Sequence, residues 1–246
     1  MTLDLTGRVA VVTGATRGLG RAIAGKLHAS GCHVYLNYRG DDAAAAQAAQ
    51  RLGPNALPLK GDVTDPTVWP ALLDTVLERH SRIDMFVHNA ASWHPMPAVG
   101  ADVDGVHGDL AVALDPLLRA APVLAKAMDG GSGRIVAVSS SGAGSAVPQY
   151  VSLGLAKAAL ESLVRYLAVE LAGAGITVNA VSTAKLDKGA QTPNPQAAAV
   201  LAHRTPGGRL TTPADVADAV ALLCTPEAGW IQGQVLTVDG GLALRS

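Results

Sequence analysis

The chain of 246 residues is poor in aromatic and in charged side chains. Phe, Trp and Tyr make up 3% of it and charged residues 16%, whereas hydrophobic residues make up 49%. A core must therefore be built mainly from Ala, Val and Leu, and the hydrophobic content is ample for a sizeable one. The formal net charge of -1 offers no attraction to nucleic acid or to an anionic membrane, so we expect neither as a partner.

Cysteine is also scarce, with only Cys32 and Cys224. Two such residues form neither a disulfide framework nor a metal-ligand spacing, and we expect both to be reduced thiols in apolar slots. The histidines show no ligand spacing either, so we predict no metal. No apolar run approaches the roughly eighteen residues of a membrane helix. A strand-like run begins by Val9, which leaves no room for a signal peptide, and we expect a cytoplasmic protein.

Short β-branched runs alternate with stretches of helical periodicity along the chain. This alternation predicts a parallel sheet with helices on both faces and right-handed crossovers. Strands are expected at residues 8–12, 33–37, 56–60, 83–87, 133–138, 176–181 and 235–238. Helices are expected at residues 18–27, 42–52, 66–80, 103–128 and 150–173. A last helix is expected to begin at Thr212 as the N-cap, with Asp215 in the capping-box position.

One segment interrupts this alternation. Residues 183–209 are rich in Ala, Pro and Gly and contain few strand formers. A stretch of that length without a clear element of its own is usually either functional or disordered. It follows a predicted strand at the edge where open α/β sheets bind their ligands. We interpret it as a lid over a substrate site rather than as a linker.

A glycine-rich turn, residues 13–20, joins the first predicted strand to the first helix. Its glycines allow a tight turn and leave room for a phosphate against the backbone. The helix behind it offers unpaired N–H groups to that phosphate. The alternative is a turn that only permits close helix–strand packing, but the position between a strand and a helix favours dinucleotide binding. The expected cofactor-binding residues of this turn are Gly14, Thr16, Arg17, Gly18, Leu19 and Gly20.

The end of the second predicted strand indicates which dinucleotide binds. A site for a ribose 2′-hydroxyl would place Asp or Glu there, but Asn37-Tyr38-Arg39 contains no acid and the next carboxylate is Asp41. Arg17 and Arg39 suit a 2′-phosphate instead. We therefore predict NADP(H), with Asn37, Tyr38 and Arg39 in the site. The alternative is that both arginines are merely solvated.

Two further strand ends add candidate cofactor contacts. Asp62 and Val63 can present a carboxylate and a backbone N–H to the adenine, although Asp is also common in the first turn of a helix. The small residues of Asn89-Ala90-Ala91 suit a place where the backbone passes close to a ribose.

A cluster of hydroxyls at residues 139–141 closes the fifth predicted strand and precedes Tyr150, which stands seven residues before Lys157. A phenol beside an ammonium can stabilise or protonate a developing oxyanion, because the positive charge favours the tyrosinate form. Seven residues span two helical turns, about 10 Å, and a Tyr150 placed just before the helix would lie closer. The alternatives are side chains that only reach into solvent and serines, Ser140 among them, that only form a turn.

Together these motifs resemble those of the short-chain dehydrogenase/reductase family over essentially the whole chain. The residues that carry the resemblance are Thr13-Gly14-x3-Gly18-x-Gly20, Asp62-Val63, Asn89-Ala90-Ala91, Ser140, the Tyr150/Lys157 pair, Asn179-Ala180-Val181 and Asp239-Gly240-Gly241. The resemblance implies one Rossmann-type domain over residues 1–246, with a seven-stranded sheet of order 3-2-1-4-5-6-7. It also implies hydride transfer from a nicotinamide and a homotetramer or homodimer. In this family Ser140 and Tyr150 would be catalytic, Lys157 would also hold the nicotinamide ribose, and Thr183 would lie near the nicotinamide.

The chain departs from most of that family at two positions. Leu153 stands where a tyrosine four residues before the lysine is usual, and Ala113 stands where an asparagine usually holds a proton-relay water. The Tyr-x6-Lys spacing is similar to that of the NADPH-using enoyl-acyl carrier protein reductases, in which Tyr150 would donate to an enolate oxygen. The leading hypothesis is an NADPH-dependent reductase of a small-molecule or acyl-carrier-bound enoyl thioester. Candidate substrate contacts are Trp93, His94 and Leu153.

Two other functions stay open. A ketone or imine reductase of specialised, polyketide-type metabolism would reuse Tyr150 as its acid, since residues 92–97 suit a compact ring as well as an acyl chain. A non-catalytic NADP-binding protein would also show Leu153 and Ala113, although the retained Tyr150 and Lys157 argue against it. His94 has the alternative reading of a solvated loop histidine.

Overall fold

A computed structural model describes residues 3–245 and contains a parallel sheet of seven strands in the order β3-β2-β1-β4-β5-β6-β7. The strands are β1 (Val9–Val12), β2 (His33–Tyr38), β3 (Ala56–Lys60), β4 (Met85–His88), β5 (Arg134–Ser140), β6 (Thr177–Thr183) and β7 (Val235–Val238). The predicted fold class and strand order are confirmed. The strand order reverses between β1 and β4, which is where sheets of this kind bind a nucleotide.

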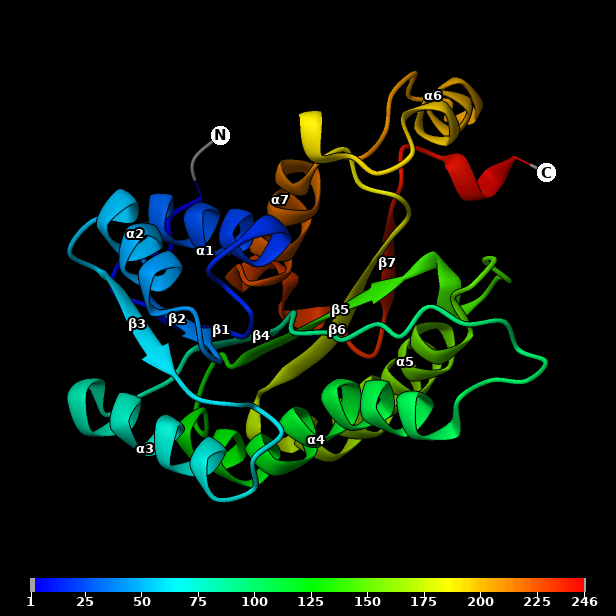
Figure 1. Ribbon diagram of the computed structural model, residues 1–246. Coiled ribbons are helices and arrows are strands. Elements are labelled where there is room, and N and C mark those ends of the chain that lie inside the picture. Colours follow the sequence, from blue (N-terminus) through cyan, green and yellow to red (C-terminus); the bar gives the residue numbers. More distant parts are fainter. Residues whose placement is uncertain (1–2, 246) are drawn as a thin grey trace.

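Helices cover both faces of the sheet. One face carries α1 (Gly18–Ala29), α2 (Asp42–Leu52) and α7 (Pro213–Leu223), and the other carries α3 (Val68–His80), α4 (Val103–Ala127) and α5 (Val151–Leu171) (Figure 1). The predicted start of α7 is confirmed, because Thr212 and Asp215 form a capping box through each other's backbone N–H. None of the helices within residues 3–245 is long and apolar enough to cross a lipid bilayer.

The segment that we expected to have no clear element contains a helix. α6 (Pro195–Arg204) lies within it, apart from the two helical layers, and a short 3-10 turn precedes it at Gly189–Gln191 (Figure 1). The carboxamide oxygen of Asn194 accepts a hydrogen bond from the Ala197 N–H, and Pro195 occupies the first turn. An N-cap followed by proline is a recognised start signal for a helix, so the sequence contained this information.

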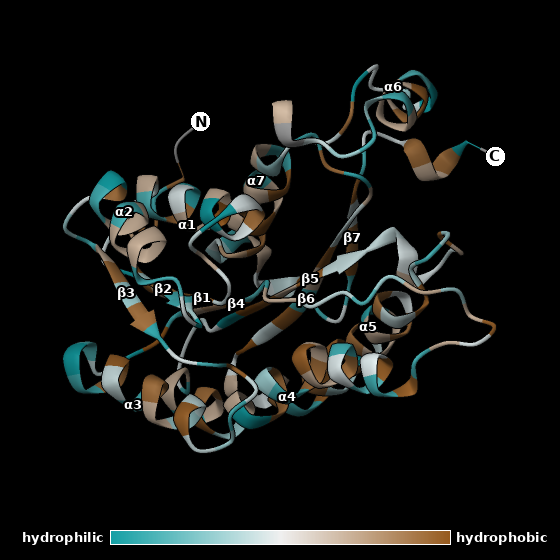
Figure 2. Ribbon diagram, in the orientation of Figure 1, coloured by the Kyte–Doolittle hydropathy of each residue, from teal (hydrophilic) through white to brown (hydrophobic). Residues whose placement is uncertain are grey.

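Alternation of side chains along the strands divides the core into two apolar clusters. Val9 and Val11 point toward α3, α4 and α5, whereas Ala10 and Val12 point toward α1 and α7. Both faces are therefore buried, which explains the continuous apolar strands. Figure 2 shows hydrophilic and hydrophobic residues alternating along α3 and α4, as expected for helices that bury only one side.

β5 and β6 run further than predicted, to Ser140 and Thr183. Those two residues are in register as neighbours on the sheet. Parallel strands that end together bring their last residues to one edge, and here that edge combines Ser140 and Thr183 with the start of α5. The extension therefore places predicted catalytic and cofactor residues side by side.

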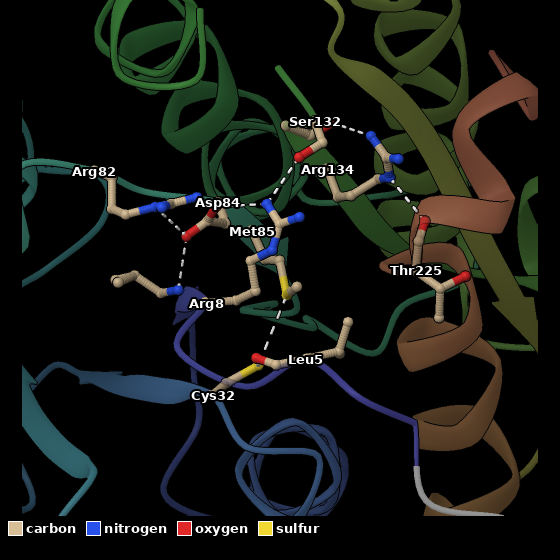
Figure 3. Close-up of polar contacts among 11 residues, drawn as sticks. Leu5, Arg8, Cys32, Arg82, Asp84, Met85, Ser132, Arg134 and Thr225 are labelled. Carbon is tan, nitrogen blue, oxygen red and sulfur yellow. Dashed lines mark hydrogen bonds and ion pairs between the residues drawn. The ribbon is translucent and has the colours of Figure 1, made fainter. Parts of the chain in front are cut away.

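The opposite, amino-terminal edge of the sheet is closed by a network of ion pairs (Figure 3). Asp84 is 5% exposed and accepts hydrogen bonds from Arg8 Nη1 at 2.9 Å, from Arg82 Nε at 2.9 Å and from the Val9 N–H at 2.9 Å. Burial by itself raises the pKa of Asp84, but these partners outweigh it and hold that pKa below its ordinary value. Asp84 is therefore a paired carboxylate that ties β1 to β4.

Candidate active site

The glycine-rich turn has two different reasons for its glycines. A side chain on Gly20 would collide with the Gly14 carbonyl, and one on Gly14 would lie 3.2 Å from the Ala90 backbone. These two glycines therefore allow close packing of helix and strand, which was the alternative to dinucleotide binding. Gly18 differs, since it has a φ of +53° and no heavy atom within 4 Å of where a side chain would begin. The turn is open to a ligand at Gly18.

The helix behind this turn leaves its N-terminus without a side-chain cap. Arg17 occupies the N-cap position of α1 and makes no capping hydrogen bond, and the first turn contains no acid. The unpaired N–H groups of a helix start, together with the positive end of its dipole, attract a phosphate. A pyrophosphate fits this place.

A cavity of about 700 Å³ extends from the turn along the ends of β2, β3 and β4. It is lined by the predicted residues Gly14, Thr16, Arg17, Gly18, Leu19, Gly20, Asn37, Tyr38, Arg39, Asp62, Val63, Asn89, Ala90 and Ala91. Gly40, Asp41, Gly61, Ser92, Val112 and Lys188 also line it and were not predicted. Two predicted cofactor residues, Lys157 and Thr183, lie outside this lining.

Two arginines and two acids line the cavity beside the ends of β2 and β3, and both acids already accept hydrogen bonds. Arg17 and Arg39 both line it, and the Arg39 side chain is 82% exposed. The carboxylate of Asp41 accepts from the Ala44 N–H at 2.9 Å and so caps α2. Asp62 uses Oδ1 for the N–H of Thr64 at 2.9 Å, while its Oδ2 lies 3.9 Å from Arg39 Nη1.

Asn37 lines the cavity, but its side chain also links two neighbouring strands. Its amide nitrogen donates to the carbonyls of Leu59 at 3.2 Å and Gly61 at 3.0 Å, which ties β2 to β3. Its backbone carbonyl accepts from the Ala15 N–H at 3.0 Å, so the carboxamide oxygen is the acceptor left for a ligand. Tyr38 likewise donates its hydroxyl to Asp42 Oδ1 at 3.0 Å, beside the ion pair of Asp42 with Lys60.

A buried histidine that the sequence analysis passed over braces the cavity wall. Thr13 Oγ1 accepts from the N–H groups of Asn89 and Ala90, both at 2.9 Å, so its own hydrogen points to His88 Nδ1 at 3.2 Å. His88 Nε2 then donates to the Ala113 carbonyl at 3.1 Å. Burial and the charge of Lys157 lower the pKa of His88 to about 3. His88 is a neutral brace between β1, β4 and α4.

Tyr150 and Ser140 meet at the carboxyl edge of the sheet. The Tyr150 hydroxyl donates to Ser140 Oγ at 3.1 Å, and Ser140 Oγ also accepts from the Gly142 N–H at 3.3 Å. Ser140 thus both forms a turn and accepts a hydrogen bond from the phenol. Tyr150 is the N-cap residue of α5 rather than part of its first turn. The preceding Gln149 has a φ of +60°, a conformation that non-glycine residues rarely adopt.

Burial is the main influence on the pKa of both Tyr150 and Lys157. Burial raises the pKa of Tyr150; the hydrogen bond with Ser140 opposes this increase and the charge of Asp109 adds to it. Burial, rather than the nearby ammonium, therefore sets the direction of the Tyr150 pKa shift. Lys157 donates to the Val138 carbonyl at 2.7 Å, and its burial lowers its pKa to about 8 against the opposing charge of Glu161. At neutral pH the pair consists of a phenol and an ammonium.

The two departures from the family pattern lie together in the structure. Leu153 and Ala113 are buried in one small apolar cluster with Ala156, and the Tyr150 ring packs against it. Leu153 was expected to contact substrate, but it lines neither cavity described here. Leu153 and Ala113, the two residues that depart from the family pattern, thus lie in the same apolar cluster.

The other expected substrate residues lie on the segment after β4. The Trp93 ring centroid is 5.8 Å from that of Tyr150, and its Nε1 donates to the Gln149 carbonyl at 3.3 Å. His94 lies on a loop with its side chain half exposed, and its Nδ1 lies 2.8 Å from Oδ1 of the buried Asp109. Asp109 was not singled out in the sequence, where nothing linked a helix carboxylate to a loop fifteen residues away.

Thr183 carries an unpaired polar atom at this edge. Its Oγ1 is buried and has no hydrogen-bond partner within the described residues. A buried hydroxyl without a partner costs free energy, and a carboxamide would satisfy it. This orphaned hydroxyl, the uncapped helix and the open Gly18 all fit a nicotinamide dinucleotide.

A second cavity of about 360 Å³ lies beside Tyr150. Its lining is mostly apolar and consists of Met96, Pro97, Ala98, Ala146, Val147, Pro148, Gln149, Tyr150 and Val151. The segments 96–98 and 146–151 are held together where Met96 N–H donates to the Gln149 carbonyl at 3.3 Å. Tyr150 is the one predicted catalytic residue in this lining.

Comparison with known proteins agrees with the fold. A family profile described as enoyl-(acyl carrier protein) reductase matches residues 14–243. The chain is 39% identical to 1-cyclohexenylcarbonyl-CoA reductase of Streptomyces collinus, over 96% of this chain and 87% of that protein. It is 33% identical to the 3-oxoacyl-acyl-carrier-protein reductase FabG of Vibrio harveyi, over 98% and 99% of the two chains.

A solved structure of a short-chain dehydrogenase/reductase double mutant from Serratia marcescens superposes with a TM-score of 0.90 and 28% identity, covering 98% of this chain and 99% of that one. The protein therefore belongs to the short-chain dehydrogenase/reductase family. It is an oxidoreductase that uses a nicotinamide cofactor, NAD(H) or NADP(H).

Proposed function

We propose that this protein is an NADPH-dependent reductase of enoyl thioesters. The observation that carries the proposal is the position of the Tyr150 hydroxyl, 3.1 Å from Ser140 Oγ and next to an apolar cavity, while Leu153 is packed into the core. The phenol that reaches Ser140 is thus the one that stands seven residues before Lys157. The family profile and the printed name of the Streptomyces relative support an enoyl thioester as substrate.

The mechanism follows from the charges at this edge. A bound reduced nicotinamide supplies a hydride to the β-carbon of the substrate. Negative charge then develops on the thioester oxygen as an enolate, and the neutral Tyr150 phenol donates a hydrogen bond to it. Lys157 is buried and charged below about pH 8, so it adds a positive potential at the same place. Ser140 orients the phenol through Oγ.

NADPH is proposed over NADH because of the adenosine end of the cavity. Arg17 and Arg39 line it; of the two acids there, Asp41 is engaged as a helix cap, and Asp62 accepts from Thr64 and lies 3.9 Å from Arg39. Guanidinium groups bind a 2′-phosphate strongly. The roles of Asp62 and Val63 at the adenine, of Lys157 at the ribose and of Thr183 at the carboxamide are part of the same proposal. So are the lid role of residues 183–209, a homotetrameric or homodimeric assembly, and a cytoplasmic location.

A ketone or imine reductase is the second candidate. Ser140, Tyr150 and Lys157 together would also protonate a carbonyl oxygen, and one relative is a 3-oxoacyl reductase by name. The apolar cavity of about 360 Å³ suits a compact ring as well as an acyl chain. A protein that binds NADP without catalysis is the third candidate. The buried, charged Lys157 argues against it, because burying a cation that has no function costs free energy of folding.

Purified protein tested with NADPH or NADH decides between these candidates. Crotonyl-CoA, longer enoyl-CoA esters and 1-cyclohexenylcarbonyl-CoA form one panel, and β-keto thioesters, cyclic ketones and cyclic imines form the other. We expect NADPH oxidation with the enoyl panel, and Arg39→Ala should weaken NADPH about tenfold while leaving NADH nearly unchanged. Turnover with ketones or imines alone would favour the second candidate, and NADPH binding without turnover the third. Equal losses for both cofactors would contradict the NADPH assignment.

A further inference from the structure

A buried methionine belongs to the wall of the apolar cavity beside Tyr150. Met96 is 7% exposed and lines this cavity of about 360 Å³ together with Tyr150. Its backbone is fixed, because its N–H donates to the Gln149 carbonyl at 3.3 Å and it pairs with Tyr150 as an isolated β-bridge. The freedom left at this position is therefore that of the side chain, which is unbranched and flexible.

The end of the Met96 side chain reaches α4 at a position that has no side chain. Gly105 is buried on α4, and a methyl group built on it would lie 2.9 Å from Met96 Cε. Its other close neighbours would be Asp102 Oδ2 at 2.9 Å and the Cβ of His94 at 3.3 Å. Carbon atoms that are not bonded to each other pack at about 3.5–4.0 Å. A methyl group on Gly105 and the present position of Met96 Cε therefore exclude each other.

The backbone of α4 gives no reason for a glycine at this position. Gly105 lies inside the helix, and its φ is not in the left-handed region that favours glycine. Glycine inside a helix lowers helix stability relative to alanine. What the missing side chain supplies is space, and the methyl end of Met96 lies next to that space.

We propose that Met96 and Gly105 together set the size of the acyl group accepted beside Tyr150, on the basis that this cavity holds the acyl group in the proposed enoyl reduction. Met96 is the specificity-determining residue, since it lines the cavity. Gly105 lines neither cavity described above and is a positioning residue, because it lets the thioether of Met96 lie back against α4. The site then takes a short or compact unsaturated acyl group, whose length the thioether limits.

Substitutions at the two positions should change this size limit in opposite directions. Met96→Ala removes the thioether, and the surroundings of a truncated buried side chain relax only partly, so the cavity should deepen toward α4. Gly105→Ala should displace Met96 Cε away from α4 and toward the cavity, because the end of a flexible side chain moves more easily than a packed helix backbone. The cavity should then become shallower.

Reduction of crotonyl-CoA, octenoyl-CoA and 1-cyclohexenylcarbonyl-CoA by NADPH measures this limit. Met96→Ala should raise kcat/KM for octenoyl-CoA about tenfold relative to crotonyl-CoA. Gly105→Ala should lower kcat/KM for octenoyl-CoA and for the cyclohexenyl ester about tenfold, and change that for crotonyl-CoA less than about twofold. The Kd for NADPH should stay near wild type in both variants, since neither residue lines the larger cavity.

Gly108→Ala is the matched control, because it adds the same methyl group to the same helix. A methyl group there would meet only His94 Cε1, at the ordinary contact distance of 3.7 Å, and the selectivity should stay that of the wild type. The double variant Met96→Ala/Gly105→Ala tests whether Gly105 acts through Met96. With the thioether gone, the added methyl group has nothing to displace, so the double variant should match Met96→Ala.

Circular dichroism shows whether each variant is folded. If Met96→Ala does not fold, the comparison of Gly105→Ala with Gly108→Ala still decides, since both substitutions favour the helix. An unchanged rank order of the three thioesters in Gly105→Ala would overturn the proposal. So would a loss of octenoyl-CoA reduction in Gly105→Ala that persists in the double variant, because the methyl group would then not act through Met96.

Binding without turnover separates these outcomes from a failure of the proposed function. Calorimetric titration of the NADP⁺ complex with butyryl-CoA and octanoyl-CoA measures the same size limit on saturated thioesters. If the wild type reduces no enoyl thioester, but Gly105→Ala weakens octanoyl-CoA about tenfold and leaves butyryl-CoA unchanged, the proposed reduction fails and the size limit stands. If the wild type reduces the enoyl thioesters and no variant changes their order, the size limit fails and the proposed reduction stands.

Discussion

The two edges of the central sheet treat their buried polar groups in opposite ways. At the amino edge, Asp84 is paired with two guanidinium groups and a backbone N–H, and its pKa is held low (Figure 3). At the carboxyl edge, Lys157 has a carbonyl and no directly bonded carboxylate, and its pKa is lowered to about 8. Thr183 Oγ1 has no partner at all among the described residues. The Asp84 carboxylate therefore has its partners within the protein, whereas the Thr183 hydroxyl does not.

This difference separates stability from function. Paired charges at the amino edge tie β1 to β4 and stabilise the folded chain, since removing one partner would strand the others. A buried ammonium and an orphaned hydroxyl at the carboxyl edge destabilise it, and such groups are found where a ligand later completes their contacts. The comparison predicts that substitutions at the carboxyl edge change activity and those at the amino edge change the free energy of unfolding.

The largest expected effect is that of Tyr150→Phe on turnover. Loss of the hydroxyl removes the donor to the developing enolate, so kcat should fall about 1000-fold, while the Kd for NADPH and the urea midpoint stay near wild type. Steady-state kinetics and urea unfolding of the same samples measure this. Tyr166→Phe, an exposed tyrosine on the same helix, is the control. Unchanged turnover in Tyr150→Phe would remove the phenol from the mechanism.

Next in size is the effect of Asp84→Asn on stability. The substitution leaves the guanidinium groups of Arg8 and Arg82 without their carboxylate, and the free energy of unfolding should fall by about 3 kcal/mol. Asp218→Asn is the matched control, because Asp218 pairs with Lys26 at the surface and should cost less than about 1 kcal/mol. Urea unfolding measures both, and kcat per folded molecule should not change. Equal losses of unfolding free energy in the two variants would contradict the stabilising role of the ion pairs at the amino edge.

The smallest expected effect is a displacement of the pH profile. Lys157 loses its proton as the pH rises through about 8, so kcat/KM should be level below that pH and fall above it. The charge of Glu161 raises the Lys157 pKa, and Glu161→Gln should therefore move the falling limb to lower pH. Glu170→Gln, on an exposed position of α5, should leave it in place. A limb that stays fixed or moves upward in Glu161→Gln would contradict the assignment to Lys157.

Much of the cofactor cavity could be predicted from the sequence, because its residues are consecutive at strand ends. Once β1, β2, β3 and β4 are recognised as parallel neighbours, their carboxyl ends must meet. Residues such as Gly18, Arg39 and Asn89 then fall on one cavity without further assumptions. Lys188 was missed, since nothing in its own sequence shows that residues 183–209 return to that cavity.

The hydrogen-bond partners of polar side chains at the carboxyl edge of the sheet could not be predicted in the same way. Asp109 and His94 are fifteen residues apart on different elements, and only the packing of α4 against the segment after β4 brings them to 2.8 Å. His88 became a neutral brace for a similar reason, since its partners Thr13 and Ala113 lie far from it in the chain. The direction of the Tyr150 pKa shift could not be predicted either, because it is set by burial, which is a tertiary property.

By itself, the sequence determined the alternation of strands and helices, the glycine-rich turn, and the spacing of Tyr150 and Lys157. These are local patterns, set by backbone conformation and by the periodicity of apolar residues. Tertiary structure decided which side chains are buried, which charges are paired and which buried hydroxyls have no partner among the described residues. Burial and pairing depend on atoms from distant segments, and they set the protonation states on which the chemistry depends.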